Sequence, residues 1–336
     1  MKCLVFGLGQ AGLAALGLLH DRGWDIVGAY SRQSHLGADI GALAGAAANG
    51  RLVQPLSAFA PRCGLADIAL FFTTSAVEDL LDAPLACLEA GINVLTIAEL
   101  AFHPWVLAPE IAARLDAAAR AGGCTLSATG VNDTVMCHLP AVVAGIVPRA
   151  DRVAIEVAGN FGALGPATLA VLPLGLTANE FAASQPGEEA PAADATTCGQ
   201  VLRALAAMGG FDITALSLDV APIFTASAIA VPTIGRTIDA GLTSGLLETA
   251  RATTRQGPVL EVRLFGKLFE PHDEEYLRVE IDGPVPIRLD LRPLPSIETT
   301  AAIAVGRAPD VIASPPGFIS ADRLATAIWR ASPFPD

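Results

Sequence analysis

Short apolar runs alternate with helix-like patterns through the first 130 residues of the chain. Strands are expected at 3–6, 25–30, 51–53, 67–72, 92–96 and 124–128. Helices are expected at 13–19, 77–90 and 109–121. Alternation of strand and helix implies a parallel sheet with right-handed crossover connections. The pattern therefore predicts an α/β domain, residues 1–130, built on a doubly wound parallel sheet.

The pattern changes after residue 130. A helix is expected at 135–146, and period-two or apolar runs predict strands at 152–158, 213–220, 259–265 and 276–281. This mixture predicts a second α/β domain, residues 131–300, on a mixed open sheet. The last segment, 301–336, contains Pro315-Pro316-Gly317 and a helical pattern from Ala321, and we expect it to return to the first domain.

The first expected strand breaks directly into a glycine-rich turn. Gly7, Gly9 and Gly12 enclose Gln10 and Ala11 in a Gly-x-Gly-x-x-Gly pattern, and a helix follows. The first glycine permits the bend, the second lets a pyrophosphate approach the backbone, and the third lets helix and strand pack closely. The helix N-terminus offers free N–H groups and a positive dipole end to the phosphates. In this context the pattern indicates a dinucleotide-binding Rossmann domain, with these residues at the cofactor.

The end of the second expected strand bears on which dinucleotide is bound. NAD-specific sites usually place Asp or Glu there to hold the ribose 2′-hydroxyl. This chain has Ser31 and Arg32 instead, and a guanidinium can grip a 2′-phosphate with two hydrogen bonds. The alternative is that Arg32 is only a solvated loop cation. The residues favour NADP, with NAD as the second option.

Polar side chains follow two further expected strands. Thr73, Thr74 and Ser75 come after 67–72, while Thr96 and Glu99 come at and beyond the end of 92–96. Ligands of parallel α/β sheets bind beyond the carboxyl ends of the strands, so we expect Thr73, Thr74, Ser75 and Thr96 to contact the cofactor. The first three could also cap the helix expected at 77–90, and the two roles are compatible.

Composition and charge argue against several classes of partner. The net charge is −13, from 34 acidic and 21 basic residues, whereas nucleic-acid phosphates need a basic surface. Hydrophobic residues make up 52% of the chain, but no uninterrupted apolar run reaches about 18 residues, so no membrane span is expected. The six cysteines and five histidines show no metal-ligand spacing. We therefore predict a reduced, cytoplasmic protein without a metal site.

Three groups of motifs resemble a known family. The first is 91–100, Gly-Ile-Asn-Val-Leu-Thr-Ile-Ala-Glu-Leu, with Pro104. The second is 128–132, Ala-Thr-Gly-Val-Asn, continuing through Val135-Met136 to Leu139-Pro140. The third combines 238–241, 244–245, 281–284 and 315–317. Together they resemble the 2,4-diaminopentanoate dehydrogenases and the native amine dehydrogenases, which share a dihydrodipicolinate-reductase-like nucleotide domain.

The resemblance implies reductive amination of a small ketone or aldehyde with ammonia and NAD(P)H, or the reverse oxidative deamination of a primary amine. In the family, a Glu at the position matching Glu99 acts on the amine. Imine formation needs a base to release neutral ammonia and a carboxylate to stabilise the iminium cation, which supports this role. The alternative is that Glu99 only complements a helix N-terminus. A homodimer through the sheet of the second domain is expected, as in other two-domain reductases.

The same segments supply the expected substrate pocket. Asn132 could orient the nicotinamide carboxamide or the substrate, or it could only form a turn. Phe102, His103 and Met136 would shape the pocket, although Phe102 and Met136 could equally belong to the core.

The chain departs from the family pattern beside this pocket. The usual Asn-Pro-Gly is Asn132-Asp133-Thr134 here, and the acidic residue that commonly follows the Met is replaced by Cys137-His138. These departures leave the substrate open. We expect His138 to be a packed helix residue, since that is the common environment of a lone histidine in an apolar pattern.

Two other functions fit the same residues. One is another NAD(P)H-dependent reductase, acting on a cyclic imine or an unsaturated acid such as dihydrodipicolinate. Such substrates favour cations that bind two carboxylates, and the central segment is sparse in them. The other is a non-catalytic NADP-binding sensor, which would bind the cofactor without turnover.

Overall fold

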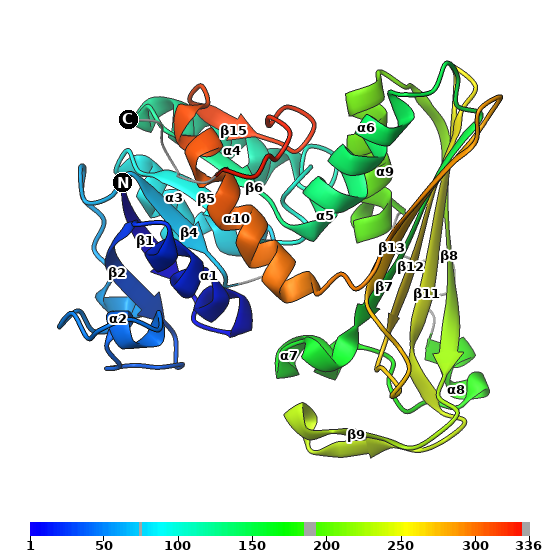
Figure 1. Ribbon diagram of the computed structural model, residues 1–336, viewed down its shortest axis with the longest axis horizontal. Coiled ribbons are helices and arrows are strands. Elements are labelled where there is room, and N and C mark those ends of the chain that lie inside the picture. The colour runs from blue at the N-terminus through cyan, green and yellow to red at the C-terminus, as the bar shows by residue number, and fades with distance from the viewer. Residues whose placement is uncertain (74–75, 185–192, 331–336) are drawn as a thin grey trace. The chain divides into compact units, whose positions relative to one another are not determined.

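The computed structural model describes residues 1–73, 76–184 and 193–330. The chain divides into two compact units, each with its own sheet (Figure 1). Unit 1 combines Met1–His138 with the described residues from Ile297 onward, and unit 2 is Leu139–Ser296. Of the expected domain limits, residue 130 directly precedes the short helix α5 (Val131–Asp133), and residue 300 lies within helix α10 (Ser296–Ala313).

Unit 1 is built on a seven-stranded parallel sheet in the order β15-β6-β5-β4-β1-β2-β3. Its strands are β1 (Lys2–Phe6), β2 (Asp25–Ser31), β3 (Gln54–Pro55), β4 (Ile68–Phe71), β5 (Asn93–Thr96), β6 (Thr125–Ala128) and β15 (Gly317–Ile319). The strand from the end of the chain therefore completes one edge of the sheet, beside β6. The last segment thus supplies one strand of the unit 1 sheet.

Helices cover both faces of this sheet. Helix α1 (Gln10–Asp21) and α10 pack on one face, and α3 (Ala83–Glu89) and α4 (Pro109–Gly122) lie on the other (Figure 1). The remaining helical segments of the unit are α2 (Ile40–Leu43), α5, two 3-10 turns (Leu56–Ala58 and Glu78–Leu81) and a π-helix (Thr134–His138). The predicted doubly wound Rossmann-type architecture is confirmed.

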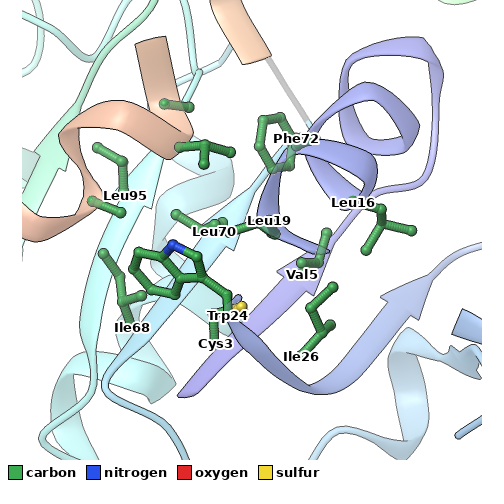
Figure 2. Packing of buried hydrophobic residues seen from close by; sticks show 14 of the residues in the cluster. Cys3, Val5, Leu16, Leu19, Trp24, Ile26, Ile68, Leu70, Phe72 and Leu95 are labelled. Atoms are coloured by element: carbon green, nitrogen blue, oxygen red, sulfur yellow. The ribbon is translucent and has the colours of Figure 1, made fainter. Parts of the chain in front are cut away.

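The core of unit 1 explains why its strands are apolar throughout. Cys3 and Val5 of β1 join the cluster drawn in Figure 2, with Leu16 of α1 and the buried ring of Trp24. Phe6, which follows Val5, faces the other way, and its ring stacks on that of Phe71 with 4.2 Å between centroids. Strands that bury both faces lose the alternation of apolar and polar residues, so the sequence shows continuous apolar runs.

Unit 2 is built on a six-stranded mixed sheet in the order β14-β13-β7-β12-β11-β8. Only the β7–β12 pair is parallel. The strands are β7 (Arg152–Asn160), β8 (Ile213–Phe224), β11 (Thr243–Thr254), β12 (Val259–Lys267), β13 (Tyr276–Asp282) and β14 (Ile287–Leu291). A two-stranded ribbon, β9 (Ile229–Val231) with β10 (Arg236–Ile238), and helices α6 (Leu139–Ala144), α7 (Pro166–Val171), α8 (Ala178–Ser184) and α9 (Thr197–Gly209) complete the main elements of the unit. The predicted mixed open sheet is confirmed.

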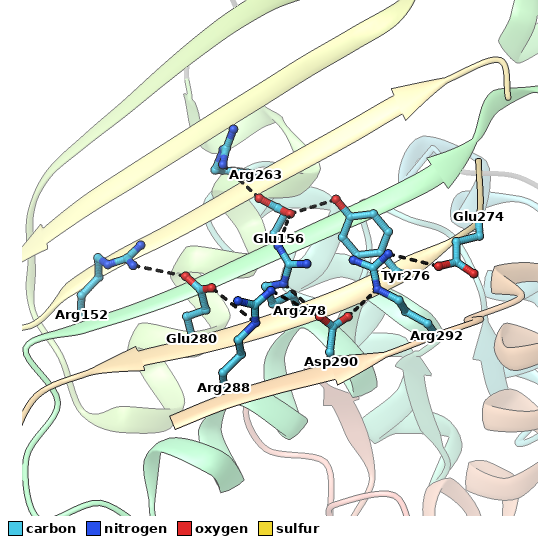
Figure 3. A network of polar contacts seen from close by, with 10 residues as sticks. All are labelled: Arg152, Glu156, Arg263, Glu274, Tyr276, Arg278, Glu280, Arg288, Asp290 and Arg292. Carbon is cyan, nitrogen blue, oxygen red and sulfur yellow. Dashed lines mark hydrogen bonds and ion pairs between the residues drawn. The ribbon is translucent and has the colours of Figure 1, made fainter. Parts of the chain in front are cut away.

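The two faces of this sheet differ in chemistry. Alternate residues such as Val262 and Val279 are buried on the face against which α9 packs. The opposite face carries a network of charges (Figure 3). The Glu156 carboxylate accepts hydrogen bonds from Tyr276 Oη at 2.9 Å and from Arg278 at 3.0 Å. We call this surface the charged face; around Glu156 it carries Arg152, Arg263, Glu274, Glu280, Arg288, Asp290 and Arg292.

Several element predictions are wrong, and proline explains two of them. The helix expected at 77–90 is a 3-10 turn followed by α3, because Pro84 has no N–H to donate to Leu80. The helix expected at 135–146 is the π-helix followed by α6, and Pro140 likewise lacks the N–H that would bond to Met136.

Tertiary contacts explain two further errors. No helix forms over 321–330, the part of this segment that the structure describes, because the Ala321 N–H donates to the Phe102 carbonyl and the Ala321 carbonyl accepts from His138 Nε2. In place of a strand at 51–53 there is one isolated bridge between Leu52 and Asp39, followed by the edge strand β3.

Candidate active site

The glycine-rich turn forms a cradle between β1 and α1. Gly7 has a φ of +83°, which favours glycine, and a Cβ there would lie 2.4 Å from the Phe72 carbonyl oxygen. A Cβ on Gly12 would lie 1.9 Å from the Gly7 carbonyl oxygen, so helix and turn meet there in backbone contact. Gly9, in contrast, has nothing within 4 Å of an added Cβ and no side chain caps α1. The space in front of Gly9 and the exposed Gln10 is open for a ligand phosphate.

The end of β2 lies next to this cradle in the sheet. Ser31 is buried and its Oγ accepts the Ser34 N–H at 3.0 Å, which shapes the loop that follows. Arg32 is exposed directly after the strand. The structure thus brings Arg32 to the sheet edge at which the cradle lies.

The end of β4 lies on the other side of the cradle. Thr73 is exposed, and its Cγ2 would be 2.9 Å from a Cβ on Gly7. The structure therefore brings Thr73 against the glycine turn. Thr74 and Ser75 lie outside the described residues.

The end of β5 carries two of the predicted site residues. Thr96 is buried, its Oγ1 accepts the Ala98 N–H at 3.1 Å, and its carbonyl accepts the Thr129 N–H at 2.9 Å. Glu99 is exposed in the turn that follows. The next helix, α4, begins only at Pro109, so the alternative that Glu99 complements a helix N-terminus does not fit the structure.

The predicted pocket residues lie on segments that meet around the end of β15. Phe102 and Met136 are buried, and Asn132 is half-buried in α5 directly beyond β6. His103 is 8% exposed, and its Nε2 lies 3.7 Å from the Asp322 carboxylate. The Asp322 carboxylate also accepts a hydrogen bond from Ser320, whose Oγ accepts from Trp105 Nε1.

The structure adds a buried ionic cluster that sequence reasoning missed. Asp133 and Arg307 form an ion pair at 2.8 Å, with side chains 0% and 1% exposed. Burial raises the pKa of the Asp133 carboxyl, and the adjacent Arg307 and the Gly130 N–H oppose that rise. Burial and the Arg307 charge lower the pKa of His138, which is buried as expected. A cation in the apolar stretch at 301–311 was the available signal for this cluster.

No group of metal-ligating side chains occurs among the residues that the structure describes. The thiols of Cys124 and Cys3, at the amino ends of β6 and β1, are not poised as nucleophiles, since burial raises the pKa of Cys124 to about 11 and that of Cys3 to about 12. In the described part of the chain, no helix is long and apolar enough to cross a membrane.

The carboxyl ends of neighbouring parallel strands thus gather the glycine cradle, Arg32, Thr73, Thr96, Glu99 and Asn132 at one edge of the sheet. The cradle leaves room where a pyrophosphate would approach, and a guanidinium flanks it, so these residues fit a nicotinamide dinucleotide. The fold of unit 1 and the residues at the carboxyl ends of its strands are those of a Rossmann-type dehydrogenase.

Comparisons with known proteins narrow this class. The chain is 29% identical to an amine dehydrogenase from Mycobacterium smegmatis, with a TM-score of 0.86 over 99% of this chain and 98% of that one. It is 26% identical over 186 residues to a 2,4-diaminopentanoate dehydrogenase from Acetoanaerobium sticklandii. That match covers 54% of this chain and about half (52%) of the relative's length.

More distant structures share the fold alone. An oxidoreductase from Agrobacterium radiobacter, in complex with NAD+, L-tartaric acid and magnesium, is 13% identical with a TM-score of 0.56, over 94% of this chain and 90% of that one. No protein-family model matches the chain. The resemblance to the 2,4-diaminopentanoate dehydrogenase and native amine dehydrogenase family that the motifs indicate is confirmed.

Proposed function

We propose that this protein is an NAD(P)H-dependent amine dehydrogenase. The reaction combines a small ketone or aldehyde with ammonia, NAD(P)H and a proton to give a primary amine, NAD(P)+ and water, and the reverse reaction deaminates the amine. The observation that carries the proposal is the exposed Glu99 carboxylate directly beyond β5, at the sheet edge that holds the glycine cradle. The similarity to the M. smegmatis amine dehydrogenase over nearly the whole chain supports it.

Glu99 is the proposed catalytic residue. As a base, its carboxylate takes a proton from ammonium and so releases the neutral amine that attacks the carbonyl carbon. As an anion, it stabilises the positive charge that develops on nitrogen when water leaves and the iminium forms. When bound, the cofactor supplies the hydride that reduces the iminium carbon.

The strand order suggests how the chain would hold the cofactor. Gly7, Gly9 and Gly12 would take the pyrophosphate, with the N–H groups of Gln10 and Ala11 pointing toward it. Arg32, exposed directly after β2, would hold the 2′-phosphate of NADP. Its position beside the cradle supports a preference for NADP over NAD. Thr96, Glu99 and Asn132, at or beyond the ends of β5 and β6, would then lie on the nicotinamide side of the cradle.

We also propose a homodimer formed through the charged face of unit 2. Its carboxylates and guanidiniums are largely paired within one chain, so two copies could meet there without burying unpaired charge. We further propose that the protein is located in the cytoplasm. All six of its cysteines are free and five of them are buried, as is common in a reducing compartment.

The first test is oxidation of NADPH at alkaline pH with high ammonium, over a panel of small ketones and aldehydes, each with and without ammonia. We expect consumption that depends strictly on ammonia. Glu99→Gln should lower that rate by about 10²- to 10⁴-fold, the usual contribution of a general base. Consumption without ammonia would identify a carbonyl or cyclic-imine reductase instead.

The matched control is Glu110→Gln. Glu110 is also exposed in unit 1, but it lies in the first turn of α4. It should keep the wild-type rate, and both variants should keep their affinity for NADPH in a direct binding titration. Binding of NADPH with no turnover on any pair of carbonyl and ammonia would contradict the proposal and favour a sensor.

A further inference from the structure

The buried ion pair between Asp133 and Arg307 invites a functional explanation. Removing two charges from water costs several kcal/mol per ion, and such a pair is often no more stable than packed apolar residues. Asp133 ends α5, just beyond β6, while Arg307 belongs to α10, far away in the sequence. The ion pair therefore links the turn after β6 to helix α10.

The other hydrogen bonds of the pair converge on the same turn. The Asp133 carboxylate accepts the Gly130 N–H at 2.7 Å and the Thr129 hydroxyl at 3.0 Å. Arg307 Nη1 also donates to Thr134 Oγ1 at 3.1 Å. Residues on both sides of Asn132 are thus fixed by one carboxylate and one guanidinium, while Arg307 Nη2 donates to the Ala325 carbonyl.

Helix α10 touches the turn at a second place. Thr300 Oγ1 accepts the Val131 N–H at 3.4 Å, and a Cβ on Gly130 would lie 3.2 Å from Thr300 Cγ2. After the turn the chain winds as a π-helix, a conformation that is frequent at functional sites. The Asn132 carbonyl accepts a hydrogen bond from Cys137 Sγ at 3.3 Å.

Asn132 is therefore held by its backbone while its side chain is left available. Its amide makes no hydrogen bond with any residue in the described part of the chain, and the side chain is half-buried. A fixed backbone carrying an uncommitted amide is the arrangement expected of a ligand-orienting residue.

We infer that Asp133 and Arg307 are positioning residues that hold Asn132 for contact with the nicotinamide end of the cofactor. The inference rests on the proposed function for its location at the nicotinamide. Asn132 acts on the ligand, and the ion pair acts only through Asn132. The ion pair and its hydrogen bonds to Gly130 and Thr134 fix the backbone of the turn that carries Asn132.

A double-mutant cycle tests this dependence. Asn132→Ala, Asp133→Asn and the double variant are compared by NADPH affinity, from nicotinamide fluorescence, and by ammonia-dependent kcat and KM. Each single variant should weaken NADPH binding and lower kcat by about tenfold or more, and the double variant should lose no more than the worse single variant, as for residues that act as a unit. Losses that multiply would overturn the inference.

The matched control is Asp310→Asn. Asp310 pairs with Arg330 at 2.7 Å from the same helix α10, and its side chain is 12% exposed. This variant should leave NADPH affinity and kcat unchanged and combine independently with Asn132→Ala. An equal loss in this control would mean that the Asp133 effect comes from a weakened helix rather than from the turn.

Thr129→Val keeps the test decisive if Asp133→Asn does not fold. It removes one hydrogen bond to the carboxylate with little change of shape, so the thermal midpoint should stay close to the wild type while NADPH affinity falls. An unchanged affinity would contradict the inference. Because binding is read without turnover, a protein that lacks ammonia-dependent activity would refute the proposed function and still show whether Asp133 and Asn132 are coupled.

Discussion

At the scale of single residues, three glycines of one turn do different physical work. Gly7 and Gly12 are held by backbone contacts that a Cβ would violate, whereas Gly9 faces open space. Because the packing of the protein does not require glycine at position 9, we attribute this glycine to the close approach of a ligand. Gly9 is therefore the residue at which folding and cofactor binding can be separated.

Gly9→Ala should leave stability nearly unchanged and weaken NADPH binding. The backbone at Gly9 (φ −76°) suits alanine, so only the approach of the pyrophosphate is obstructed. We expect the Kd for NADPH to rise by about tenfold or more, equal to ~1.4 kcal/mol. The control is Gly17→Ala, in the helix α1 that follows Gly9; a Cβ there would have its nearest contact at 3.9 Å, and the variant should keep the wild-type Kd. Unchanged NADPH binding by Gly9→Ala would contradict the proposed cradle.

Arg32→Ala should change the choice of cofactor. If the guanidinium grips the 2′-phosphate, the Kd for NADPH should rise by about tenfold while the Kd for NADH stays the same. Isothermal titration with both cofactors measures the ratio. Equal losses for the two cofactors, or none, would make Arg32 a solvated cation and remove the argument for NADP.

His138 should make stability depend on pH. Burial and Arg307 lower its pKa in the folded protein from an ordinary value of 6.5, with Asp133 and Asp322 opposing the shift. Folding thus favours neutral His138, and this stabilisation is complete above pH 6.5 and is lost as the pH falls below it.

The measurement is the free energy of unfolding at about pH 7.5 and pH 5.5, for the wild type and His138→Gln. Glutamine can still donate to the Ala321 carbonyl that accepts from His138 Nε2 at 2.8 Å, but it does not titrate. The variant should lose less stability between the two pH values than the wild type. Parallel losses would show that other groups control the acid response.

At the scale of elements, the apolar pattern of the sequence correctly predicts several strands of unit 1. The β1–α1 turn and the strands β4, β5 and β6 follow from apolar runs bounded by turn residues. Thr73, Thr96, Glu99 and Asn132 lie at or beyond the carboxyl ends of these strands. Strand β11 was missed because its charged-face positions, such as Thr249 and Arg251, are not apolar. Helices α9 and α10 were not predicted in their Ala-rich stretches, although Thr196 and Gly210 cap the two ends of α9.

The ion pair of Asp133 and Arg307 could not be predicted for a different reason, which is the distance between its partners in the sequence. Asp133 and Thr134 were recognised only as departures from a family pattern, and Arg307 was not singled out. Their pairing depends on α10 lying against the turn beyond β6, a contact between segments far apart in the chain. No local pattern encodes such a contact, so the ion pair could not be predicted without the fold.

At the scale of the whole molecule, the charged face should control assembly. Thr249 of β11 lies directly opposite Arg263 of β12 on that face. Thr249→Arg places two like charges opposite each other and adds bulk, which should separate a dimer that forms there. Light scattering should give twice the chain mass of 34.4 kDa for the wild type and one chain for the variant.

Thr237→Arg is the control for this experiment, because Thr237 is exposed on the β9–β10 ribbon rather than on the charged face. It should remain a dimer. A wild-type protein that is monomeric at all concentrations, or a Thr249→Arg variant that still dimerises, would contradict the proposed interface.

The late position of β15 in the chain has a consequence for biosynthesis. Unit 2 is one continuous segment, so it can fold on the ribosome as soon as its last strand emerges. Unit 1 begins first but must wait, because α10 and β15 arrive only after unit 2 has been made. Until then β6 offers an unpaired edge to other chains. We therefore expect the nascent unit 1, rather than unit 2, to be the part prone to aggregation. Premature termination before β15 should yield aggregates rather than a smaller enzyme.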